Sequence, residues 1–426
     1  MPRRVIVVGA GLAGLAAAVQ AQRRGARVVL QEAASHAGGR CRSYFDDKLG
    51  VTVDNGNHLL FSGNHAAIAY LRAIGAADTL IGPPEPDFPF FDAASGAAWT
   101  IRMSAGRFPR WIFDADARVP DTQPADYFPI LPLFFGKPGR TVDGRGKGRV
   151  WDLLARPMLR AMLNTEPVDA SATMVANVVR ETLAMGGQAC RPLIARHGLS
   201  NAFVGPALRH LQYGGAEIRL GSRIVGMVIS GTDSHERVSS LAFEHAAGSH
   251  DVQLAPDDAV ILAVPPDTAR ELVPGLAAPD AYRAIATVHF AIDLPDDTTA
   301  MMCIVNGTSD WLFTAKGRVS VTMMDAGRLL ATPREALAHT VWQEAAKALR
   351  VPAVPVPPWQ VVMEQRATFA AVPSQEGLRA ATKTRWNNLT LAGDWTATGL
   401  PATIEGAIRS GQKAADALMN PSMEGR

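Results

Sequence analysis

Short apolar runs alternate with small-residue and polar stretches at the beginning of the chain. Val5 to Val8 form a continuous apolar run, which is typical of a parallel strand buried on both faces. Leu12 to Ala21 are mostly small and apolar and predict a helix, while Arg27 to Gln31 predict a second strand that ends at Glu32. A strand, a helix and a second strand within about 30 residues predict a βαβ unit.

Further apolar runs predict more strands for this domain and the strands of a second domain. Ala216 to Ser230 predict two strands around a turn, and another buried strand ends in Val264-Pro265-Pro266. Near the end of the chain, Leu389 to Ala392 predict a strand, followed by a helix that starts near Thr403. Between these stretches, RAIATVHFAIDL and RVSVTMMD predict strands of another sheet. We therefore predict an α/β fold with a Rossmann-like domain and a second domain of mixed sheet and helices.

The bulk composition narrows the class of protein. A chain of 426 residues is long enough for two domains, and a net charge of +2 gives no reason to expect nucleic acid as a partner. Cys41, Cys190 and Cys303 lie far apart without a CxxC pair, so neither a disulfide framework nor a metal site is predicted. No secretory signal and no run of about 18 apolar residues is evident, so we expect a cytoplasmic protein. Contact with the inner face of the cytoplasmic membrane stays open.

The turn after the first strand carries a glycine pattern with a known physical use. Gly9, Gly11 and Gly14 form GxGxxG, and Glu32 follows at the end of the second strand. Gly9 permits a tight turn, Gly11 lets the backbone approach a pyrophosphate, and Gly14 lets helix and strand pack closely. The helix N-terminus favours the phosphates, and the Glu32 carboxylate can accept hydrogen bonds from an adenosine ribose. This context predicts dinucleotide binding.

The residues after Glu32 distinguish a flavin from a nicotinamide. Gly38-Gly39-Arg40 follows shortly afterwards, and the arrangement resembles the flavin-binding amine oxidase and phytoene desaturase superfamily. The resemblance implies a GR2-type flavoprotein in which these residues run along the FAD diphosphate and flavin. It also implies cofactor contacts from Gly393 and Asp394, from the helix start at Thr403 and Ile404, and from the backbone of Val225 to adenine. The chain has no second GxGxxG for a separate nicotinamide cofactor.

The stretch VDNGNHLLFSGNH places an acid, amides and histidines around an apolar triplet. Its position soon after Arg40 predicts a return of the chain to the flavin. Asp54 and His58 are candidates for a proton donor or its orienting partner. Two simpler interpretations stay open, in which Asp54 bonds N–H groups of its own turn and His58 only holds the loop. We expect Leu59 to Phe61 to face an apolar substrate cavity.

Three segments together resemble one branch of the superfamily, the squalene-associated FAD-dependent desaturases, or hydroxysqualene dehydroxylases of hopanoid biosynthesis. They are VDNGNHLLFSGNH, AMLNTEPVDASA and LAGDWTATGLPATIEGAIRSG. The resemblance implies reductive removal of an allylic hydroxyl from hydroxysqualene, with reduced FAD as the electron donor and squalene as the product. It further implies squalene-synthase-like enzymes upstream and an external reductant. Such a reaction needs an acid to protonate the leaving hydroxyl, and Glu166 is a third candidate for it, at a position where the branch more often carries proline.

Alternatives on the same fold are a carotenoid or phytoene desaturase and an amine or porphyrinogen oxidase. Trp395 could form half of the aromatic cage of an amine oxidase, but no matching tyrosine follows it. A protein that binds flavin and lipid without turnover is a further alternative. Large apolar segments with few polar groups favour an apolar isoprenoid substrate.

The domain organisation is predicted to be discontinuous. Residues 1–85, 200–275 and 385–426 are expected to form the FAD-binding domain, and residues 86–199 and 276–384 the substrate-binding domain. Near residues 125–160 an apolar aromatic run precedes basic residues, which is typical of a surface that dips into a membrane interface. A proline-rich core segment followed by a solvated basic loop explains the same pattern equally well.

Overall fold

The computed structural model describes residues 3–142, 146–231 and 236–419. Five parallel strands form one sheet in the order β10-β2-β1-β14-β20. Val7 of the central strand pairs with Leu30 on one side and with Ile261 on the other. The strands are β1 (Arg4–Val8), β2 (Arg27–Glu32), β10 (Glu217–Leu220), β14 (Ala259–Leu262) and β20 (Leu389–Leu391).

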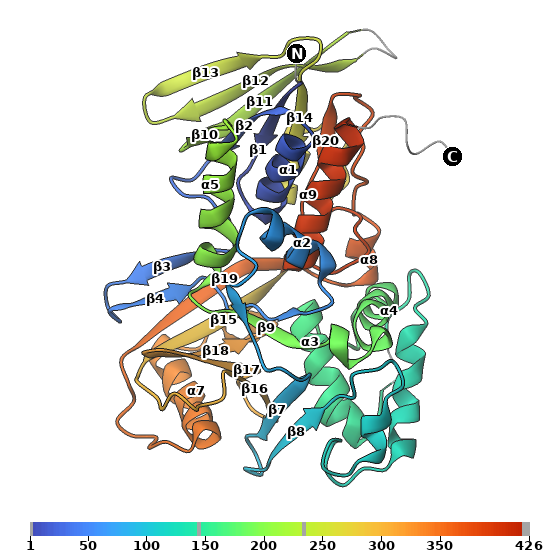
Figure 1. Ribbon diagram of the computed structural model, residues 1–426, viewed down its shortest axis with the longest axis vertical. Coiled ribbons are helices and arrows are strands. Elements are labelled where there is room, and N and C mark those ends of the chain that lie inside the picture. Colours follow the sequence, from blue (N-terminus) through green and yellow to red (C-terminus); the bar gives the residue numbers. More distant parts are fainter. Residues whose placement is uncertain (1–2, 143–145, 232–235, 420–426) are drawn as a thin grey trace.

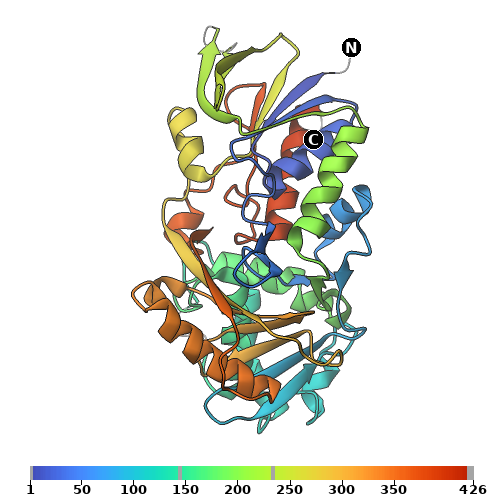
Figure 2. The same cartoon turned by 90° about the vertical axis from the view of Figure 1, so that its left-hand side faces the viewer.

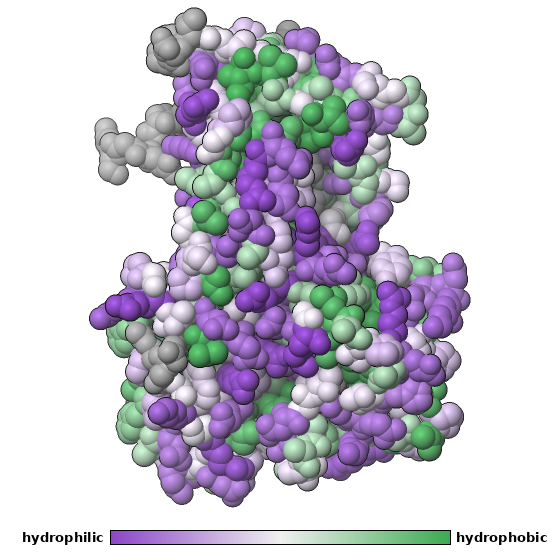
Figure 3. All heavy atoms as spheres, turned by 180° about the vertical axis from the view of Figure 1, so that it is seen from behind, coloured by the Kyte–Doolittle hydropathy of each residue, from purple (hydrophilic) through white to green (hydrophobic). Residues whose placement is uncertain are grey.

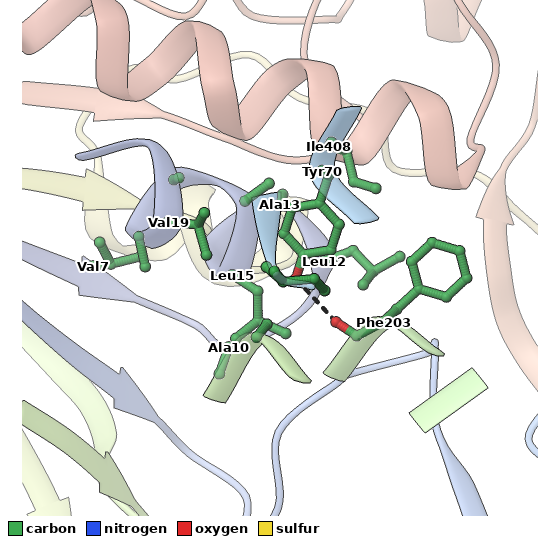
Figure 4. Close-up of a cluster of buried hydrophobic side chains, with 14 of the residues drawn as sticks. Val7, Ala10, Leu12, Ala13, Leu15, Val19, Tyr70, Phe203 and Ile408 are labelled. Atoms are coloured by element: carbon green, nitrogen blue, oxygen red, sulfur yellow. Dashed lines mark hydrogen bonds between the residues drawn. The ribbon is translucent and has the colours of Figure 1, made fainter. Parts of the chain in front are cut away.

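The strands of this sheet carry apolar side chains on both faces, so both faces have to be covered. Helices cover one of them. Val7 and Ile261 pack with residues of α1 and α9 in one buried cluster. Within the cluster, the Tyr70 hydroxyl donates a hydrogen bond of 2.9 Å to the carbonyl oxygen of Phe203 (Figure 4). The helices are α1 (Leu12–Arg23), α2 (His65–Ala73), α5 (Gly205–Tyr213) and α9 (Ile404–Met419). The first and last segments of the chain therefore share one core (Figure 1).

A small antiparallel sheet covers the other face. Ile6, Val8 and Val29 point away from α1 and pack with Leu241 and Phe243 in a second buried cluster. The antiparallel strands are β11 (Arg223–Ser230), β12 (Arg237–His245) and β13 (Gly248–Gln253), and α6 (Pro266–Leu272) follows β14. The parallel sheet is thus covered on both sides, and the carboxyl ends of its strands remain at one edge.

A second, mixed sheet has seven strands in the order β19-β15-β18-β17-β16-β7-β8. Only β16 and β7 pair in parallel. The strands are β7 (Asp87–Asp92), β8 (Ala98–Arg102), β15 (Tyr282–Ala291), β16 (Met301–Val305), β17 (Trp311–Ala315), β18 (Arg318–Met323) and β19 (Trp359–Phe369). Helix α7 (Arg334–Leu349) lies along the outer face of this sheet (Figure 2).

The two faces of the seven-stranded sheet differ in chemistry because side chains alternate along each strand. Ala286, Val288 and Phe290 of β15 pack against α7 in the third buried cluster. Thr287 and His289, the alternate residues of the same strand, point to the opposite face, where the stretch after Val51 lies. The polar side of this sheet therefore faces the parallel-sheet unit.

Short elements and helices complete the fold (Figure 1), and we call the seven-stranded sheet with the helices and loops packed on it the second unit. They include the strands β3 (Ser43–Asp46), β4 (Val51–Asp54), β5 (Leu60–Phe61), β6 (Leu80–Ile81) and β9 (Pro192–Ala195), and the helices α3 (Arg156–Leu163), α4 (Ala172–Glu181) and α8 (Pro373–Glu376). Two 3₁₀ helices, η1 (Arg110–Phe113) and η2 (Pro124–Phe134), follow β8. Seen from behind, polar residues gather at mid-height, between the upper and lower parts of the molecule (Figure 3).

The predicted elements occur where the sequence placed them. The first strand, helix and second strand are confirmed as β1, α1 and β2. The two strands predicted after Ala216 are confirmed as β10 and β11, but they belong to different sheets, since β10 pairs with β2 and β11 pairs with β12. The domain boundaries stay a prediction. Strand β9 pairs with both β5 and β6, so a small sheet joins residues from the two sides of the predicted boundary near residue 85.

The expectation for the apolar triplet was wrong at one position. Phe61 lines an apolar cavity in the second unit, and Leu59 packs beside it. Leu60 instead belongs to the core below α1. The reason is that Leu60 and Phe61 form the strand β5, in which neighbouring side chains point in opposite directions.

Candidate functional site

The glycine loop after β1 forms an open cradle at the carboxyl edge of the parallel sheet. Gly9 has a φ of +102°, and a Cβ atom there would lie 2.3 Å from the carbonyl oxygen of Ala263. A Cβ atom at Gly11 would meet nothing within 4 Å, so open space lies beside it. A Cβ atom at Gly14 would lie 1.8 Å from the oxygen of Gly9, so only glycine fits there.

The N-terminus of α1 is available to a ligand. Gly11 precedes the helix, and no side chain caps the first turn. The backbone N–H groups of that turn therefore point toward the open space beside Gly11, together with the positive end of the helix dipole. A diphosphate is the kind of group that such a terminus binds.

Glu32 lies where the sequence predicted it, at the carboxyl end of β2. Its two carboxylate oxygens accept hydrogen bonds from the N–H groups of Ala10, at 2.6 Å, and Ala34, at 2.8 Å. Each carboxylate oxygen can accept more than one hydrogen bond. The carboxylate is thus fixed beside the glycine loop, with capacity left for ribose hydroxyls.

The segment Gly38-Gly39-Arg40 lies against the glycine loop. Gly38 forms a β-bridge with Gly11, and its N–H donates to the oxygen of Ala10 at 2.8 Å. Gly38 and Gly39 both have positive φ, which glycine adopts without strain. Gly39 is exposed at the cradle, so the predicted second glycine pair borders the same open space as Gly11.

An ion pair joins the two ends of the chain at this place. Arg40 donates to the Asp394 carboxylate at 2.6 Å and to the carbonyl oxygen of Ala367 at 2.5 Å. The neighbouring Asp394 carboxylate raises the pKa of Arg40. Gly393 precedes this acid, and a Cβ atom there would lie 2.4 Å from the indole nitrogen of Trp395. The two predicted motifs, far apart in sequence, therefore form one structure.

Arg379 supports the loop after β20 and was not foreseen. Its guanidinium donates to the carbonyl oxygen of Asp394 at 3.0 Å and to the Thr398 hydroxyl at 2.8 Å. Burial lowers the pKa of Arg379 to about 10. A lone arginine in a loop carries no spacing signal, so the sequence could not reveal this role.

The start of α9 has its own cap. The Thr403 hydroxyl accepts a hydrogen bond from the N–H of Gly406 at 3.0 Å, and Ile404 is buried in the first core cluster. Thr403 thus caps the first turn, as threonine commonly does. Glu405 turns away and accepts from the N–H groups of Ala66 and Ala67 at 3.0 and 2.8 Å. Its carboxylate fixes α2 against α9.

Val225 lies at a bulge in β11. The register passes from Ile224 to Gly226 without a partner for Val225, whose side chain is 42% exposed. Ile224 points into the second core cluster instead. A bulged residue leaves the regular ladder, which suits a backbone contact to a ligand. The adenine contact of Val225 stays a prediction.

Asp54 is a junction between three parts of the chain. One carboxylate oxygen accepts hydrogen bonds from the Ser43 hydroxyl at 2.6 Å and the N–H of Leu199 at 2.9 Å. The other lies 3.5 Å from a guanidinium nitrogen of Arg318. Asp54 is buried, with 5% of its surface exposed. These contacts favour a structural role for the carboxylate.

His58 is held by its own turn. Its Nδ1 lies 2.9 Å from the carbonyl oxygen of Gly56, which can only accept, so Nδ1 carries the hydrogen. Burial lowers the pKa of His58. At neutral pH the ring is therefore uncharged, and Nε2 is a hydrogen-bond acceptor. With Nδ1 committed to Gly56, Nε2 is the ring atom left to contact another group.

The amides of the same stretch meet a polar band on the seven-stranded sheet. The Asn57 amide donates to the Thr322 hydroxyl at 3.2 Å, and the Thr287 hydroxyl lies 3.3 Å from that of Thr322. The Asn55 amide lies 3.5 Å from the carboxylate of Glu364. We define the polar band as the side chains that share this face of β15, β18 and β19: Thr287, His289, Ser320, Thr322 and Glu364.

Sequence reasoning missed the polar band. A signal existed, because Thr287 and His289, and likewise Ser320 and Thr322, alternate with apolar residues in the predicted strands. Their meeting with Asn57 depends on strand register, which periodicity does not give. Burial lowers the pKa of His289 to about 3, and its Nδ1 lies 2.8 Å from the Ser320 hydroxyl.

The structure places Glu166 away from these groups. Its carboxylate oxygens lie 3.2 Å from Arg156 and 3.2 Å from Arg160, both on α3. Arg160 also lies 3.2 Å from Asp310. Burial raises the pKa of Asp310 to about 6. The arginines lie on the opposite side of α3 from Met158 and Met162, which line the apolar cavity.

The cavity has a volume of about 90 Å³ and an almost wholly apolar lining. Phe61 and Phe88 line it, together with Met158 and Met162 of α3. The remaining lining residues come mainly from the segments 101–134 and 179–190. Such a lining fits hydrocarbon and offers little to a charged ligand.

Trp395 is part of the core. Only 2% of its surface is exposed, and its indole N–H donates to the carbonyl oxygen of Val264 at 3.0 Å. It therefore ties the loop after β20 to the end of β14. This position gives no support to an aromatic cage. Among the described residues, no three His, Cys, Asp or Glu side chains lie close enough together to hold a metal ion.

These features agree with the wider comparisons. A family model for flavin containing amine oxidoreductases matches residues 12–419. The chain belongs to this family. As a flavin containing amine oxidoreductase it is an FAD-dependent enzyme of the oxidoreductase class. The open glycine cradle, the uncapped helix N-terminus and the Arg40–Asp394 pair fit that cofactor.

Three relatives that cover almost the whole chain are named hydroxysqualene dehydroxylase. The protein from Rhodopseudomonas palustris is 46% identical, with 98% of this chain and 99% of the relative covered. The protein from Sinorhizobium fredii is 44% identical, with 99% of each chain covered. The resemblance to the branch of squalene-associated flavoproteins is therefore confirmed.

Solved structures support the fold. Cyclohexylamine oxidase from Brevibacterium oxydans has a TM-score of 0.69 at 16% identity, with 99% of each chain covered. An oxidoreductase from Methanosarcina mazei has a TM-score of 0.70 at 13% identity, with 97% of this chain and 100% of that chain covered. The predicted α/β fold, with an FAD-binding domain and a second domain, is confirmed.

Proposed function

We propose that this flavoenzyme is a hydroxysqualene dehydroxylase that forms squalene for hopanoid biosynthesis. The observation that carries the proposal is the full-length similarity to relatives of that name, at 46% and 44% identity. The apolar cavity supports it, because a hydrocarbon chain needs such a lining. The buried Trp395 gives no support to the amine oxidase alternative.

The reaction removes one oxygen and needs two electrons. The allylic C–O bond breaks, the oxygen leaves as water after gaining a proton, and a new C–H bond forms at carbon. Reduced FAD, held by the Gly9–Gly14 loop and the region of the Arg40–Asp394 pair, would supply the electron pair and the hydrogen for that bond. The protein has to hold the hydroxyl, deliver a proton to it and keep bulk water from the reacting carbon.

We assign the hydroxyl to the region of the polar band beside Asn57. The Thr322 hydroxyl lies 3.2 Å from the Asn57 amide and 3.3 Å from the Thr287 hydroxyl, so it links the two in a chain of hydrogen bonds. They are donors and acceptors on a sheet face that becomes apolar toward Phe88 and Phe90 at the other end. One sheet face thus offers polar groups for a hydroxyl and an apolar surface for the hydrocarbon.

The candidate acids take different roles in this proposal. Asp54 is a positioning residue, because its carboxylate already accepts two hydrogen bonds and faces Arg318. His58 orients the hydroxyl through Nε2, since its Nδ1 hydrogen is used by Gly56. Glu364 is half-buried beside Asn55 and is the carboxyl group that we propose as proton donor. Glu166 stabilises α3 through its arginines.

The remaining partners are part of the same proposal. A squalene-synthase-like enzyme upstream would supply the hydroxylated substrate, and an external reductant would restore reduced FAD. No helix in the described ranges is long and apolar enough to cross a bilayer. We propose peripheral contact with the inner face of the cytoplasmic membrane through the apolar part of segment 125–160. Residues 143–145 of that segment lie outside the described residues.

The proposal is tested with the purified holoenzyme. The flavin is reduced without oxygen, hydroxysqualene is added in detergent, and reoxidation of the flavin is followed together with squalene formation. Formation of squalene in proportion to flavin reoxidised is the expected result. If reduced flavin ignores hydroxysqualene while oxidised flavin is bleached by phytoene or by an amine, the enzyme belongs to one of the alternative classes.

Variants of the candidate residues test their roles. Glu364→Gln keeps the size of the side chain but removes the acid, so we expect turnover to fall roughly 100-fold with FAD still bound. Glu166→Gln is the matched control, because its carboxylate lies among the arginines of α3. His58→Ala should raise KM more than it lowers kcat. Equal turnover in Glu364→Gln and the parent enzyme would remove Glu364 from the proposal.

A further inference from the structure

Apolar side chains are exposed together on one part of the second unit. Monomeric proteins seldom expose large contiguous apolar patches, and those that exist usually bind something. We define the apolar rim as the exposed residues of segments 108–135 and 183–185. Its members are Phe108 (65% exposed), Phe113 (61%), Phe128 (66%), Leu131 (49%), Phe135 (74%), Leu183 (38%) and Met185 (41%).

The segments of the apolar rim are in contact, so the rim is one surface. The rings of Phe108 and Phe113 stack with their centroids 6.3 Å apart. The rings of Trp111 and Tyr127 meet edge to face at 5.3 Å and join η1 to η2. On the other side, the Arg107 guanidinium lies 3.9 Å from the sulfur of Met185. Segments 108–135 and 183–185, which are distant in sequence, therefore form one face.

The apolar cavity lies directly beneath this face. Ile130, Leu133 and Phe134 of η2 line the cavity, whereas Phe128 and Leu131 of the same helix are exposed. Trp111 of η1 and Leu183 of segment 183–185 also line the cavity. The same segments thus form the outer surface and the outer wall of the cavity.

From this geometry we infer that the apolar rim inserts into a lipid bilayer and admits the substrate from it into the cavity. The inference rests on the proposed function, because an isoprenoid hydrocarbon is dissolved in membranes and not in water. A protein partner would need an apolar contact surface, but it would have no need of an apolar cavity behind that surface. Aromatic rings that end at a membrane interface are a common anchor.

The charged residues around the rim favour a bilayer that contains anionic lipid. Arg107, Arg110 and Lys137 are exposed at its border and suit anionic headgroups. Acids are also present, and two of them are engaged locally. Asp126 accepts a hydrogen bond from the N–H of Gln123, and Asp114 accepts from the N–H of Asp116. Insertion of the rings should therefore dominate binding, with a smaller contribution from anionic lipid.

The location differs from the expectation that the sequence supported. Segment 125–160 was predicted to combine an apolar run with basic residues that follow it. In the structure Arg149 pairs with Asp121 at 3.2 Å, and Arg156 pairs with Glu166 at 3.2 Å. The apolar part of the predicted segment forms η2, which belongs to the rim. Phe108, Phe113 and Leu183 of the rim come from outside the predicted segment.

The test measures binding of the oxidised holoenzyme to vesicles by co-sedimentation, without turnover. The vesicles contain phosphatidylethanolamine alone or mixed with phosphatidylglycerol. In the double variant Phe108→Ser/Phe128→Ser we expect vesicle binding to weaken roughly tenfold for each ring removed. The double variant Tyr213→Ser/Val354→Ser is the matched control, since these residues are 89% and 71% exposed and lie outside the rim. Flavin absorbance and thermal unfolding verify that both variants are folded.

Turnover assays separate this inference from the proposed function. With hydroxysqualene in vesicles the rim variant should be slow, whereas with detergent-dissolved substrate it should match the parent enzyme. Absence of turnover from the parent enzyme in both forms would contradict the proposed function and leave the binding result intact. Equal vesicle binding of the rim variant and the parent would overturn the inference. A rim that instead mediates a dimer, lost in the rim variant without any vesicle binding, would also overturn it.

Discussion

At the residue scale, the polarity of the stretch after Val51 is accounted for by its partners. Asn57 and Asn55 pair with the polar band, while Asp54 joins three segments through Ser43, Leu199 and Arg318. A buried polar group without a partner would cost roughly 1–3 kcal/mol, so this concentration of amides requires an equally polar surface opposite. The seven-stranded sheet provides it on one face only.

The Thr322 hydroxyl is central to that contact, and its removal is a sharp test. Thr322→Val keeps the shape but leaves the Asn57 amide and the Thr287 hydroxyl without their shared partner. We expect turnover of hydroxysqualene to fall roughly tenfold and the free energy of unfolding to fall by about 1–2 kcal/mol. Steady-state kinetics and denaturant unfolding measure the two effects.

The control for this variant is Thr314→Val in the neighbouring strand β17. Thr314 donates a hydrogen bond of 2.8 Å to the carbonyl oxygen of Thr299, away from the polar band. It should lose stability to a similar degree and keep full turnover. If both variants lose turnover equally, the effect of Thr322 is only structural.

His289 makes stability depend on pH. Burial lowers its pKa to about 3, below the value near 6.5 of a free imidazole. The unfolded chain binds the proton and the folded chain does not, so the free energy of unfolding should fall as pH drops from about 6.5 toward 3. Asp310 acts in the opposite direction, since its pKa is raised to about 6 and its contribution is lost as pH rises.

The variant His289→Asn isolates this effect. Its amide can still reach the Ser320 hydroxyl but does not titrate, so the loss of stability between about pH 6.5 and pH 5 should become smaller. Urea unfolding at the two pH values measures it. An unchanged difference between these pH values would show that other groups control the acid side.

At the element scale, the sequence predicted best where local pattern and backbone geometry coincide. The GxGxxG turn requires glycine at Gly9 and Gly14 for steric reasons, so β1, α1 and β2 could be placed from the residues alone. The strands β15 and β18 were also evident from their apolar runs. The pattern of apolar and polar residues could not predict the register in which these strands pair. Thr287, Thr322 and Asn57 come from three distant segments, and only pairing across the sheet brings them together.

The same limit applies to the direction of single side chains. The apolar triplet 59–61 was expected to face one cavity, but the pairing of β5 with β9 sends Leu60 to the other core. Glu405 is a similar case. From the sequence it was an acid in the first turn of a helix, and the structure shows that its carboxylate serves the N-terminus of a different helix, α2.

The contacts of Glu405 predict that its carboxylate stabilises the packing of α2 against α9. Its carboxylate is 4% exposed and also lies 3.0 Å from Arg409. Glu405→Ala would leave the Ala66 and Ala67 N–H groups without an acceptor, and we expect a loss of roughly 2–3 kcal/mol in the free energy of unfolding. Glu181→Ala, which removes the other, exposed partner of Arg409, should cost less than about 1 kcal/mol. Thermal and denaturant unfolding compare them, and equal losses would contradict the capping role.

At the scale of the whole molecule, the FAD-binding unit is assembled from both ends of the chain. α1 and α9 share one core, and Arg40 pairs with Asp394 across 354 positions of sequence. Such long-range closure costs chain entropy that local contacts do not offset. A ligand bound at the meeting point of the glycine loop and the loop after β20 should therefore stabilise the entire fold.

Removal of FAD tests this coupling. A ligand that binds only the folded state stabilises it by about 1.4 kcal/mol for each tenfold excess over its Kd. We expect the deflavinated protein to unfold at a lower temperature and the unfolding temperature to rise with added FAD. In Arg40→Ala the Asp394 carboxylate loses its ion pair beside the cradle, so this FAD dependence should shift to higher FAD concentrations. Arg24→Ala, which removes an exposed pair between α1 and α9, is the control and should leave the FAD dependence unchanged. An unfolding temperature independent of FAD would mean that the two ends associate without the cofactor.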